Sequence, residues 1–494
     1  MMATEGTYPF VGGGVSTWCH QLCEGVRDVD FTLLAVTGGP RVTSQYKLPP
    51  SVKELLLVPL WPEGDETPYV YSDGWSGAIQ RRARTTARTV ERHWLPPLRT
   101  VLREVFDGGV PTGALLDALA EMALFLRGHD YRTAMRARAT WRAFLDVIDE
   151  HRGGEYLGRC PPPTARDASL CARWFYHLML PLALAPLRAT VFHATIAASC
   201  ALPGVVGRRL DGTRFALTEH GVYLRERYLA VSASDEQPLV KRFLVGLATT
   251  IGRACYASAD VISPVAYFNA RWEVPWEAAP SQVRVIYNGV DAERFRPGEA
   301  PPRSRPTAVV AARVFPLKDI ETLVRAAAVA RVRVPDLQVL VYGSLDADPP
   351  YVARCRALID ALDLGECVLF KGFHARPHEL YLDGDICVLS SISEGFPYTV
   401  IESMACGVPC VATDVGGVRE AIADTGLVVA PRDPEALGNA MAELLLDPAR
   451  RRRLGEDARA RASTQFTLDR QIRSYEALYR ALAEDRRDGT ARAS

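Results

Sequence analysis

Two glutamates in residues 391–410 (SISEGFPYTVIESMACGVPC) form the part of the sequence best suited to chemistry. Glu394 belongs to the loop SEGFPY, and Glu402 belongs to a helix that we expect to begin near Pro397, where a missing N–H costs no hydrogen bond. By helical spacing the two carboxylates would lie on nearly one side, about two turns apart. The free N–H groups at such a helix start attract anions. This segment is therefore suited to a phosphate with hydroxyl groups on either side of it.

A basic pair, Arg313 and Lys318, follows a buried strand in the segment TAVVAARVFPLKDIETLVRA. Arginine binds phosphate oxygens through a planar fork and lysine binds them as a point charge, so the pair would neutralise a diphosphate. By spacing alone, an exposed pair of cations is an equally good interpretation. The two glutamates have the same alternative, because most glutamates are solvated.

The elements that would position these side chains alternate between strands and helices. LQVLVYGS, CVLFKGF, DICVLSS and VPCVATD read as buried strands separated by helices, which predicts a parallel, doubly wound sheet. FTLLAVTGG, ELLLVPLW and ATVFHATIA are strand-like in the first half. A chain of 494 residues exceeds one hydrophobic core, so two domains or more are expected.

Two further candidates lie in the first half of the chain. Gly13 and Gly14 precede a helix in EGTYPFVGGGVSTW and would let backbone N–H groups approach a ligand, although a plain turn explains a glycine triplet equally well. His220 ends the strand-like RFALTEHG, where a strand becomes a loop. A lone histidine is more often structural than functional.

Composition excludes several classes of function. Lys and Arg together equal Asp and Glu at 58 each, so no nucleic-acid partner is indicated. The eleven cysteines lack zinc-site spacing and fit reduced thiols. The N-terminus has no export signal, and the most apolar run, WFYHLMLPLALAPL, is too short and too interrupted to span a membrane.

A helical block with a basic stripe interrupts the first domain. Residues 76–187 read as helices, and Arg81, Arg84, Arg88 and Arg92 follow one another along one helix face. A solvated face is the ordinary interpretation of such a stripe. The alternative is contact with an anionic membrane surface or an acidic partner.

The motifs together resemble a known family. Glu394, GFP and Glu402, with SMACG and VP, resemble the donor-site motif of the family 4 retaining glycosyltransferases of the GT-B fold. ARVFPLKDIETLVRA resembles the phosphate clamp of that family. EGTYPFVGGGVSTW and TEHGVYLRER resemble the PelF-like branch, which builds exopolysaccharide. One departure is the start of the chain, where only MMAT stands for a full first strand.

The resemblance implies an α/β protein of two Rossmann-like domains that face a cleft, with the helical insertion in the first. The expected parts are an N-terminal acceptor domain (1–297, insertion about 76–187), a linker (298–306), a nucleotide-sugar donor domain (307–466), a C-terminal helix that crosses back (467–484) and a disordered tail (485–494).

The resemblance also implies the roles of the site residues. Arg313, Lys318 and the helix start at Pro397 would hold the diphosphate, Glu402 the ribose, and Glu394 the sugar. His220 would line the sugar pocket and Phe373, in KGF, the base pocket. The expected catalytic residues are Glu394, His220, Arg313 and Lys318, and the remaining donor-binding residues are Gly13, Gly14, Phe373, Gly395, Phe396, Pro397, Tyr398, Thr399 and Glu402.

No metal and no cofactor are expected, because the cations and the helix start would stabilise the leaving diphosphate. The DxD-like tripeptides 28–30 and 383–385 lie outside the family motif and read as turns. A phosphorylase of the same fold would need pyridoxal phosphate on a lysine, but Lys318 and Lys371 are otherwise explained. A nucleotide-sugar epimerase is the other alternative with this fold.

The resulting hypothesis is a cytoplasmic, metal-independent retaining hexosyltransferase that moves a sugar from a UDP-sugar, with UDP-glucose favoured, to a glycan or exopolysaccharide acceptor. An alternative from another class is a non-catalytic nucleotide-sugar-binding subunit. Such a subunit would help to assemble a polysaccharide synthase at the inner face of the membrane, through the arginine stripe.

Overall fold

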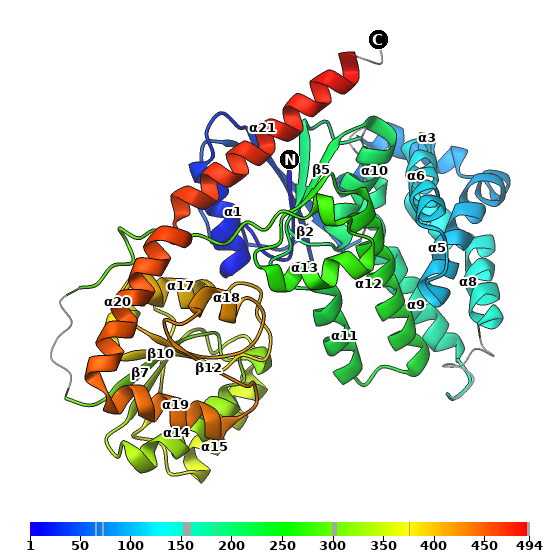
Figure 1. Cartoon of the computed structure of the whole chain (residues 1–494). Coiled ribbons are helices and arrows are strands. Elements are labelled where there is room, and N and C mark those ends of the chain that lie inside the picture. The colour runs from blue at the N-terminus through cyan, green and yellow to red at the C-terminus, as the bar shows by residue number, and fades with distance from the viewer. Residues whose placement is uncertain are drawn as a thin grey trace. The chain divides into compact units, whose positions relative to one another are not determined.

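The computed structural model describes residues 1–64, 67–71, 74–151, 160–184, 186–298, 304–374 and 376–491 (Figure 1). The chain divides into two compact units. Unit 1 comprises Met1–Pro264, Ala270–Val285 and Tyr475–Ser494, and unit 2 comprises Val265–Asn269 and Ile286–Ser474. Of the predicted linker, residues 299–303 lie outside the described residues.

Unit 1 contains a six-stranded parallel sheet in the order β3-β2-β1-β4-β5-β6. Its first strand is short, as expected, but it pairs with a neighbour on each side. The strands are β1 (Met2–Glu5), β2 (Phe31–Thr37), β3 (Val52–Pro59), β4 (Val191–Ala194), β5 (Arg214–Leu217) and β6 (Val261–Ile262). The helices that connect them outside the insertion are α1 (Gly14–Gly25), α10 (Leu202–Asp211), α11 (Tyr223–Ala233) and α12 (Pro238–Ser258). Helix α13 (Tyr267–Glu273) follows β6, and its first three residues belong to unit 2.

The helical insertion lies between β3 and β4 and shares one hydrophobic core with the sheet. Helix α12 crosses α5 so closely that a Cβ on Gly246 would meet the carbonyl oxygen of Val105. Figure 1 shows α5, α6 and α9 beside α12. The elements are α2 (Thr67–Val70), α3 (Gly74–Arg84), α4 (Ala87–Thr89), a π-helix (Val90–Trp94), α5 (Leu95–Asp107), α6 (Thr112–Gly128), α7 (Tyr131–Arg136), α8 (Arg138–Glu150), α9 (Ala165–Leu178) and a 3-10 turn (Leu180–Ala183).

The predicted arginine stripe needs correction. The helix that was expected to carry it breaks after α3, where the side-chain oxygen of Thr86 caps the next turn. Arg81 is buried, with its guanidinium carbon 3.7 Å from the ring centroid of Tyr71. Arg84, Arg88 and Arg92 are exposed. Because Arg81 is buried and the other three are exposed, the four arginines do not form one solvated face.

Unit 2 contains a second six-stranded parallel sheet, in the order β12-β11-β10-β7-β8-β9. The strands are β7 (Thr307–Ala311), β8 (Gln338–Tyr342), β9 (Val368–Gly372), β10 (Ile386–Leu389), β11 (Cys410–Thr413) and β12 (Leu427–Val429). The helices are α14 (Ile320–Arg333), α15 (Pro349–Ala361), α16 (Pro377–Leu380), α17 (Tyr398–Ala405), α18 (Val418–Ile422), α19 (Pro434–Leu446) and α20 (Pro448–Gln465).

Alternate residues of the strands in unit 2 enter two separate cores. Ala308 and Val310 pack with α14, α15 and α19, whereas Val309 packs with α17, α18 and α20. Figure 1 shows these two sets of helices on opposite faces of the sheet. Each unit thus has the Rossmann strand order, counted along its own chain, with helices on both faces. The predicted α/β fold of two Rossmann-like domains is confirmed.

Two boundaries differ from the sequence-based expectation. Unit 2 begins at Ile286, ahead of the predicted boundary at residue 297, because Asn288 donates a side-chain hydrogen bond to the carbonyl of Phe396 at 2.8 Å. The last helix, α21 (Leu468–Ala491), extends through residues 485–491, which were expected to be disordered. Residues 485–491 contain no proline, the residue that would break the helix most strongly. Residues 492–494 lie outside the described residues.

Helix α21 joins the core of unit 1 from Tyr475 onward. Tyr479 shares a hydrogen bond of 2.7 Å with Nδ1 of His193 on β4, and the hydroxyl of Tyr475 lies 3.1 Å from that of Thr218, just after β5.

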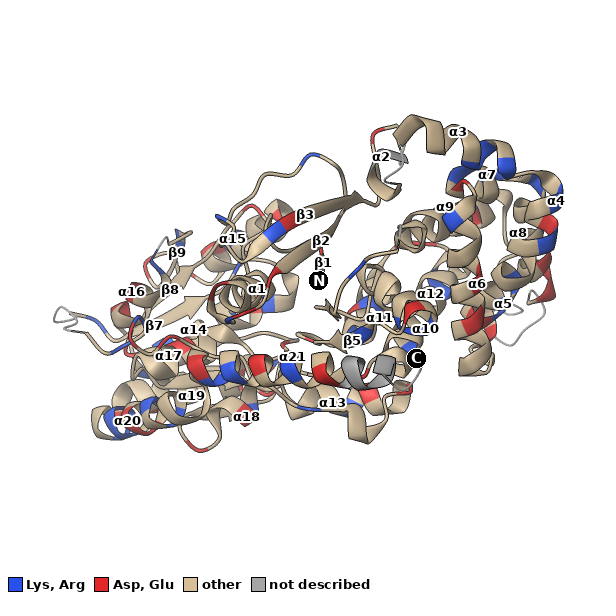
Figure 2. Ribbon diagram, turned by 90° about the horizontal axis from the view of Figure 1, so that it is seen from above, with Lys and Arg blue, Asp and Glu red and all other residues tan. Residues whose placement is uncertain are grey.

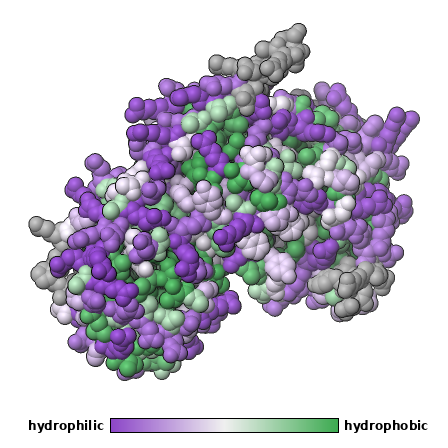
Figure 3. Space-filling view, viewed as in Figure 1, coloured by the Kyte–Doolittle hydropathy of each residue, from purple (hydrophilic) through white to green (hydrophobic). Residues whose placement is uncertain are grey.

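All eleven cysteines are free thiols. No helix in the described part of the chain is long and apolar enough to cross a membrane, and hydrophilic residues cover most of the face seen in Figure 3.

Candidate functional site

The candidate site of unit 2 lies at the point where its strand order reverses. β7 and β10 are neighbours in the sheet, but their following helices cover opposite faces. Open parallel sheets bind ligands at such switch points, outside the carboxyl ends of the strands. The loops after β7 and β10 meet there: the hydroxyl of Ser390 donates to the carbonyl of Lys318 at 2.7 Å, and the amide of Ile392 to that of Leu317 at 2.9 Å.

Lys318 and Glu394 form an ion pair at the junction of these loops. The distance from Nζ of Lys318 to Oε1 of Glu394 is 2.5 Å, and the hydroxyl of Ser391 donates to the same oxygen at 2.6 Å. The side chains are 22% and 11% exposed. Two residues that were predicted from separate motifs are therefore in direct contact, and a polar ligand can still reach both.

Glu402 has a different partner. Its Oε2 accepts a hydrogen bond of 2.6 Å from the hydroxyl of Tyr381. Burial in the surrounding protein raises the pKa of Glu402 to about 7, although the Tyr381 hydrogen bond and the charge of Arg294 oppose this shift. Near neutral pH this carboxyl therefore exists in both protonation states.

Helix α17 begins at Tyr398 and has no side-chain cap. Pro397 is the N-cap residue and no acidic residue lies in the first turn, so no side chain neutralises the helix dipole there. The hydroxyl oxygen of Thr399 is buried and has no hydrogen-bond partner among the described residues. As predicted, Glu394 belongs to the loop before the helix and Glu402 to the helix itself, so helical spacing does not describe the geometry between them.

The loop 394–397 is held from two sides. The amide of Gly417 donates to the carbonyl of Gly395 at 2.6 Å, and Phe396 is buried against Tyr287 and Phe466. Gly416 has φ +57°, and a Cβ there would lie 2.0 Å from the carbonyl oxygen of Glu394. The backbone of the site is therefore fixed by a close approach that only glycine permits.

Two predicted donor-binding residues have no contact with this cluster. Arg313 is exposed, lies over the Phe315 ring at 5.5 Å, and forms no ion pair within the described part of the chain. Phe373 follows β9 and is 81% exposed. Their assignments to the diphosphate and the base remain predictions.

Unit 1 carries the other predicted residues. Gly13 caps α1 and Gly14 begins it, with φ +151° at Gly13 and no side-chain cap. The ring of His220 packs edge-on against Trp18 at 4.6 Å, and its Nε2 has no hydrogen-bond partner within the described residues. Burial lowers the pKa of His220 to about 3, so the ring is neutral at physiological pH.

Sequence reasoning missed Tyr381, because no motif surrounds it and only the fold brings it to Glu402. It did not assign Ser391 a role, although this residue opens the Glu394 loop. In the tripeptide 383–385, Asp383 accepts from the hydroxyl of Tyr342 and Asp385 from the amide of Thr307. These carboxylates serve the fold, and no metal-type group of three or more ligands exists among the described residues.

Two Rossmann-like units in one chain define the GT-B class of fold. Residues 291–461 match the glycosyl transferases group 1 family, so the chain carries a group 1 glycosyl transferase domain. Residues 1–281 match a family described as a domain of unknown function (DUF3492). This second match covers more than half of the chain, and the protein belongs to that family.

Several curated glycosyltransferases are similar to part of this chain. The D-inositol 3-phosphate glycosyltransferase of Acidothermus cellulolyticus is 32% identical over 282 residues, which is 53% of this chain and 61% of that protein. The N-acetyl-alpha-D-glucosaminyl L-malate synthase of Bacillus anthracis is 33% identical over 156 residues, 31% of this chain and 40% of that protein. The chain spans about half the length of the curated relatives it matches.

Solved structures share the fold. Sucrose-phosphate synthase from Thermosynechococcus elongatus has a TM-score of 0.59 at 21% identity, over 97% of this chain and 98% of that chain. Anabaena Alr3699/HepE in complex with UDP has a TM-score of 0.50 at 18% identity, over 59% of this chain and 78% of that chain. At these identities the likeness concerns the fold alone.

Proposed function

We propose that the protein is a metal-independent, retaining glycosyltransferase of family 4, in the PelF-like branch, which uses a UDP-sugar of the UDP-glucose type. The observation that carries this proposal is the Lys318–Glu394 pair beside the uncapped start of α17, at the strand-order switch of unit 2. A cation and free N–H groups are what a leaving diphosphate requires.

Each residue has one role in this proposal. Lys318, Arg313 and the first N–H groups of α17 bind the diphosphate, with the backbone of residues 395–399 close to it. Glu394 accepts hydrogen bonds from sugar hydroxyls, and Glu402 from the ribose. Gly13 and Gly14 of unit 1 bind the donor through their backbone, and His220 of unit 1 lines the sugar pocket. Phe373, which belongs to unit 2, stacks on the base.

The reaction proceeds by displacement on one face of the sugar. The bond between the anomeric carbon and the diphosphate oxygen breaks, and the acceptor oxygen bonds to that carbon from the same side. The acceptor proton passes to the leaving phosphate. Isolation of a covalent glycosyl-enzyme would contradict this scheme.

The proposed donor is supported by the ligands of a fold relative, whereas the choice of acceptors to test draws on the names of curated relatives. Anabaena Alr3699/HepE, a fold relative, was crystallised with UDP and with UDP-glucose. For the acceptor we propose a glycan or exopolysaccharide. The curated relatives named for D-inositol 3-phosphate make this compound a second acceptor to test.

The test is an assay of hydrolysis and transfer from UDP-glucose by wild-type protein and the Glu394→Gln variant, with glycan and D-inositol 3-phosphate acceptors. Wild-type turnover that persists in EDTA and falls at least ~100-fold in the variant is the expected result. A rise in melting temperature with UDP, exceeding that with GDP or ADP, would show the nucleotide preference. Absence of turnover with every donor, despite UDP binding, would contradict catalysis.

That last result would favour the alternative, a nucleotide-sugar-binding subunit of a synthase at the inner membrane face. The short first strand suggested this alternative, but β1 pairs with a strand on each side. We therefore favour the enzyme over the binding subunit. We also propose that the enzyme acts in the cytoplasm.

A further inference from the structure

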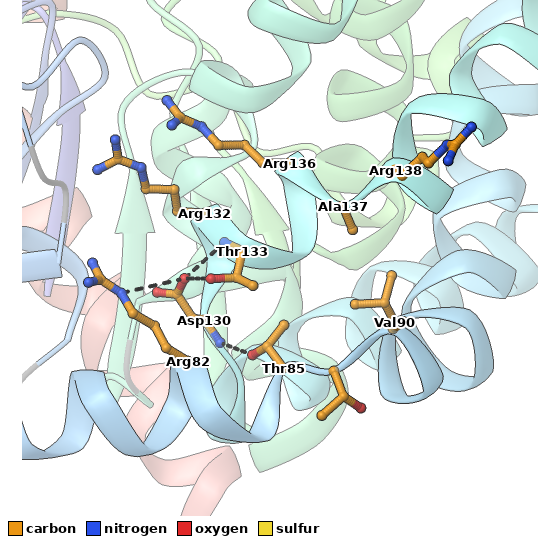
Figure 4. Close-up of a pocket in the computed structure, with 11 residues that line it drawn as sticks. Arg82, Thr85, Val90, Asp130, Arg132, Thr133, Arg136, Ala137 and Arg138 are labelled. Carbon is orange, nitrogen blue, oxygen red and sulfur yellow. Dashed lines mark hydrogen bonds and ion pairs between the residues drawn. The ribbon is translucent and has the colours of Figure 1, made fainter.

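A basic pocket lies in the helical insertion, far along the chain from the residues discussed above. It has a volume of about 760 Å³ and is lined from α3, α4, α7 and α8 (Figure 4). Its charged lining residues are Arg82, Asp130, Arg132, Arg136 and Arg138. Four arginines against one aspartate give the pocket a strong excess of positive charge.

The single carboxylate is already engaged. Oδ1 of Asp130 accepts hydrogen bonds from the amide of Thr133 at 2.8 Å and from its hydroxyl, and it lies 4.0 Å from Nε of Arg82. The amide of Asp130 in turn donates to the hydroxyl of Thr85 at 2.8 Å. These hydrogen bonds hold the start of α7 against the end of α3, and Asp130 and Thr85 at this junction both line the pocket.

The other arginines lack such partners. Arg132, Arg136 and Arg138 form no ion pair within the described ranges, and Arg132 is half-buried. In Figure 4, Arg82, Arg132 and Arg136 extend their guanidinium groups to the same side of the view. The positive charges of neighbouring arginines repel one another, and an anion bound between them would offset this repulsion by attracting each of them.

The start of α8 faces the same pocket. Its N-cap residue, Ala137, cannot accept a hydrogen bond through its side chain, and its first turn contains no acidic residue. The thirteen-residue helix therefore leaves unsatisfied N–H groups at the edge of the pocket that Ala137 lines. Arginine forks and a helix start together match the geometry of a phosphate group.

A neighbouring surface indicates one source of such a phosphate. Trp75 and Ile79 on α3 are 72% and 66% exposed, and at spacings of seven and three residues they share a helix face with Arg82. Figure 2 shows basic residues gathered over α3, α4 and α7. Exposed aromatic and apolar side chains beside arginines are typical of surfaces at a lipid interface.

We propose that this pocket binds a phosphate monoester or diphosphate group through Arg82, Arg132, Arg136 and the N–H groups of α8. The group belongs either to a lipid headgroup or to a soluble phosphorylated molecule. The site is separate from the donor site proposed in unit 2 and does not depend on it.

The test measures hydrogen exchange of backbone amides in residues 86–90 and 130–141 with inorganic pyrophosphate. Pyrophosphate should slow exchange in wild-type protein and in the charge-matched control Arg88→Ala/Arg92→Ala, whose arginines do not line the pocket. The Arg132→Ala/Arg136→Ala variant should lose the effect and bind about tenfold more weakly. No protection in wild-type protein, or protection that persists in this variant, would overturn the proposal. Because the readout is local, binding at the donor site does not affect it.

Vesicle sedimentation separates the two sources. Binding to phosphatidylcholine vesicles that contain phosphatidic acid, but not to pure phosphatidylcholine, supports a lipid headgroup if Arg132→Ala/Arg136→Ala and Trp75→Ala/Ile79→Ala both weaken it. Local protection by pyrophosphate without vesicle binding supports a soluble ligand. Variants are compared only after their melting curves match the wild type.

Discussion

At the scale of single residues, Glu402 is the group of the site whose charge changes near neutral pH. Its pKa is raised to about 7, above the ordinary 4.5, by burial. The folded protein therefore binds this proton more tightly than the unfolded chain, and its stability decreases as pH rises from about 4.5 to about 7. Ligand binding should show the opposite trend, because the ionised carboxylate is the better acceptor for ribose hydroxyls.

We predict that UDP binds about tenfold more weakly at about pH 6 than at about pH 8, following the ionised fraction of Glu402. Calorimetric titration at several pH values measures this change. The Glu402→Gln variant should lose most of the trend, which separates it from titration of UDP itself. The exposed Glu366→Gln control should keep it. Equal slopes in wild-type and Glu402→Gln proteins would contradict the assignment.

The two cations of the site should differ in what they do for the fold. Lys318→Ala leaves the nearly buried Glu394 without its ion pair and should lower the free energy of unfolding by ~1–3 kcal/mol. Arg313→Ala removes an exposed side chain and should change it by less than ~0.5 kcal/mol.

Both substitutions should nevertheless reduce turnover by ~100-fold, because each cation stabilises the leaving diphosphate. Urea unfolding and kcat together measure the difference. Full activity of Arg313→Ala would remove this residue from the site.

At the scale of elements, the loop that carries Glu394 is held by the start of α18. Gly416 and Gly407 both have positive φ, +57° and +74°, but only at Gly416 would an added Cβ clash with backbone atoms. Gly407 follows α17 in the left-handed conformation, and its nearest neighbour is 3.5 Å from an added Cβ. Alanine substitutions at Gly407 and Gly416 therefore separate the cost of backbone strain from the cost of a steric clash with a neighbouring backbone atom.

We predict that Gly407→Ala costs ~1–2 kcal/mol of stability through its φ alone. Gly416→Ala should cost ~1–3 kcal/mol more, because its Cβ displaces the carbonyl of Glu394. Thermal unfolding measures the difference, and turnover should fall only in Gly416→Ala. Equal stability and activity of the two variants would contradict a rigid loop.

At the scale of the whole molecule, the last helix, α21, packs into the hydrophobic core of unit 1. Tyr475, Leu478, Tyr479 and Leu482 of α21 are at most 8% exposed and pack in unit 1. His193, whose pKa burial lowers to about 3, is neutral and is hydrogen-bonded between Tyr479 and Thr218.

A chain that ends after Ser474 should therefore lose roughly 6–12 kcal/mol of stability in unit 1, at about 1.5–3 kcal/mol for each of these four buried side chains. Hydrogen exchange should quicken in β1, β4 and β5. A chain that ends after Glu484 keeps these four residues and serves as the control. Unchanged exchange after the longer truncation would show that unit 1 does not need α21.

Local sequence predicted the elements well. Apolar runs marked β7 and β10, and the loop SEGFPY marked the segment before α17. The prediction failed for side chains whose surroundings are formed by residues that are not their neighbours in the sequence. Arg81 looked exposed by helical periodicity, yet Tyr71 covers it, and Tyr381 gave no sign that it would bond to Glu402.

The sequence by itself determined the alternation of strands and helices and the residue types that could bind a diphosphate, because backbone preference and apolar periodicity act over a few residues. Only the tertiary structure decided that the loops after β7 and β10 meet and pair Lys318 with Glu394. It also decided that α3, α4, α7 and α8 enclose a basic pocket. Such contacts depend on strand order and helix packing, which arise from burial among residues far apart in the chain.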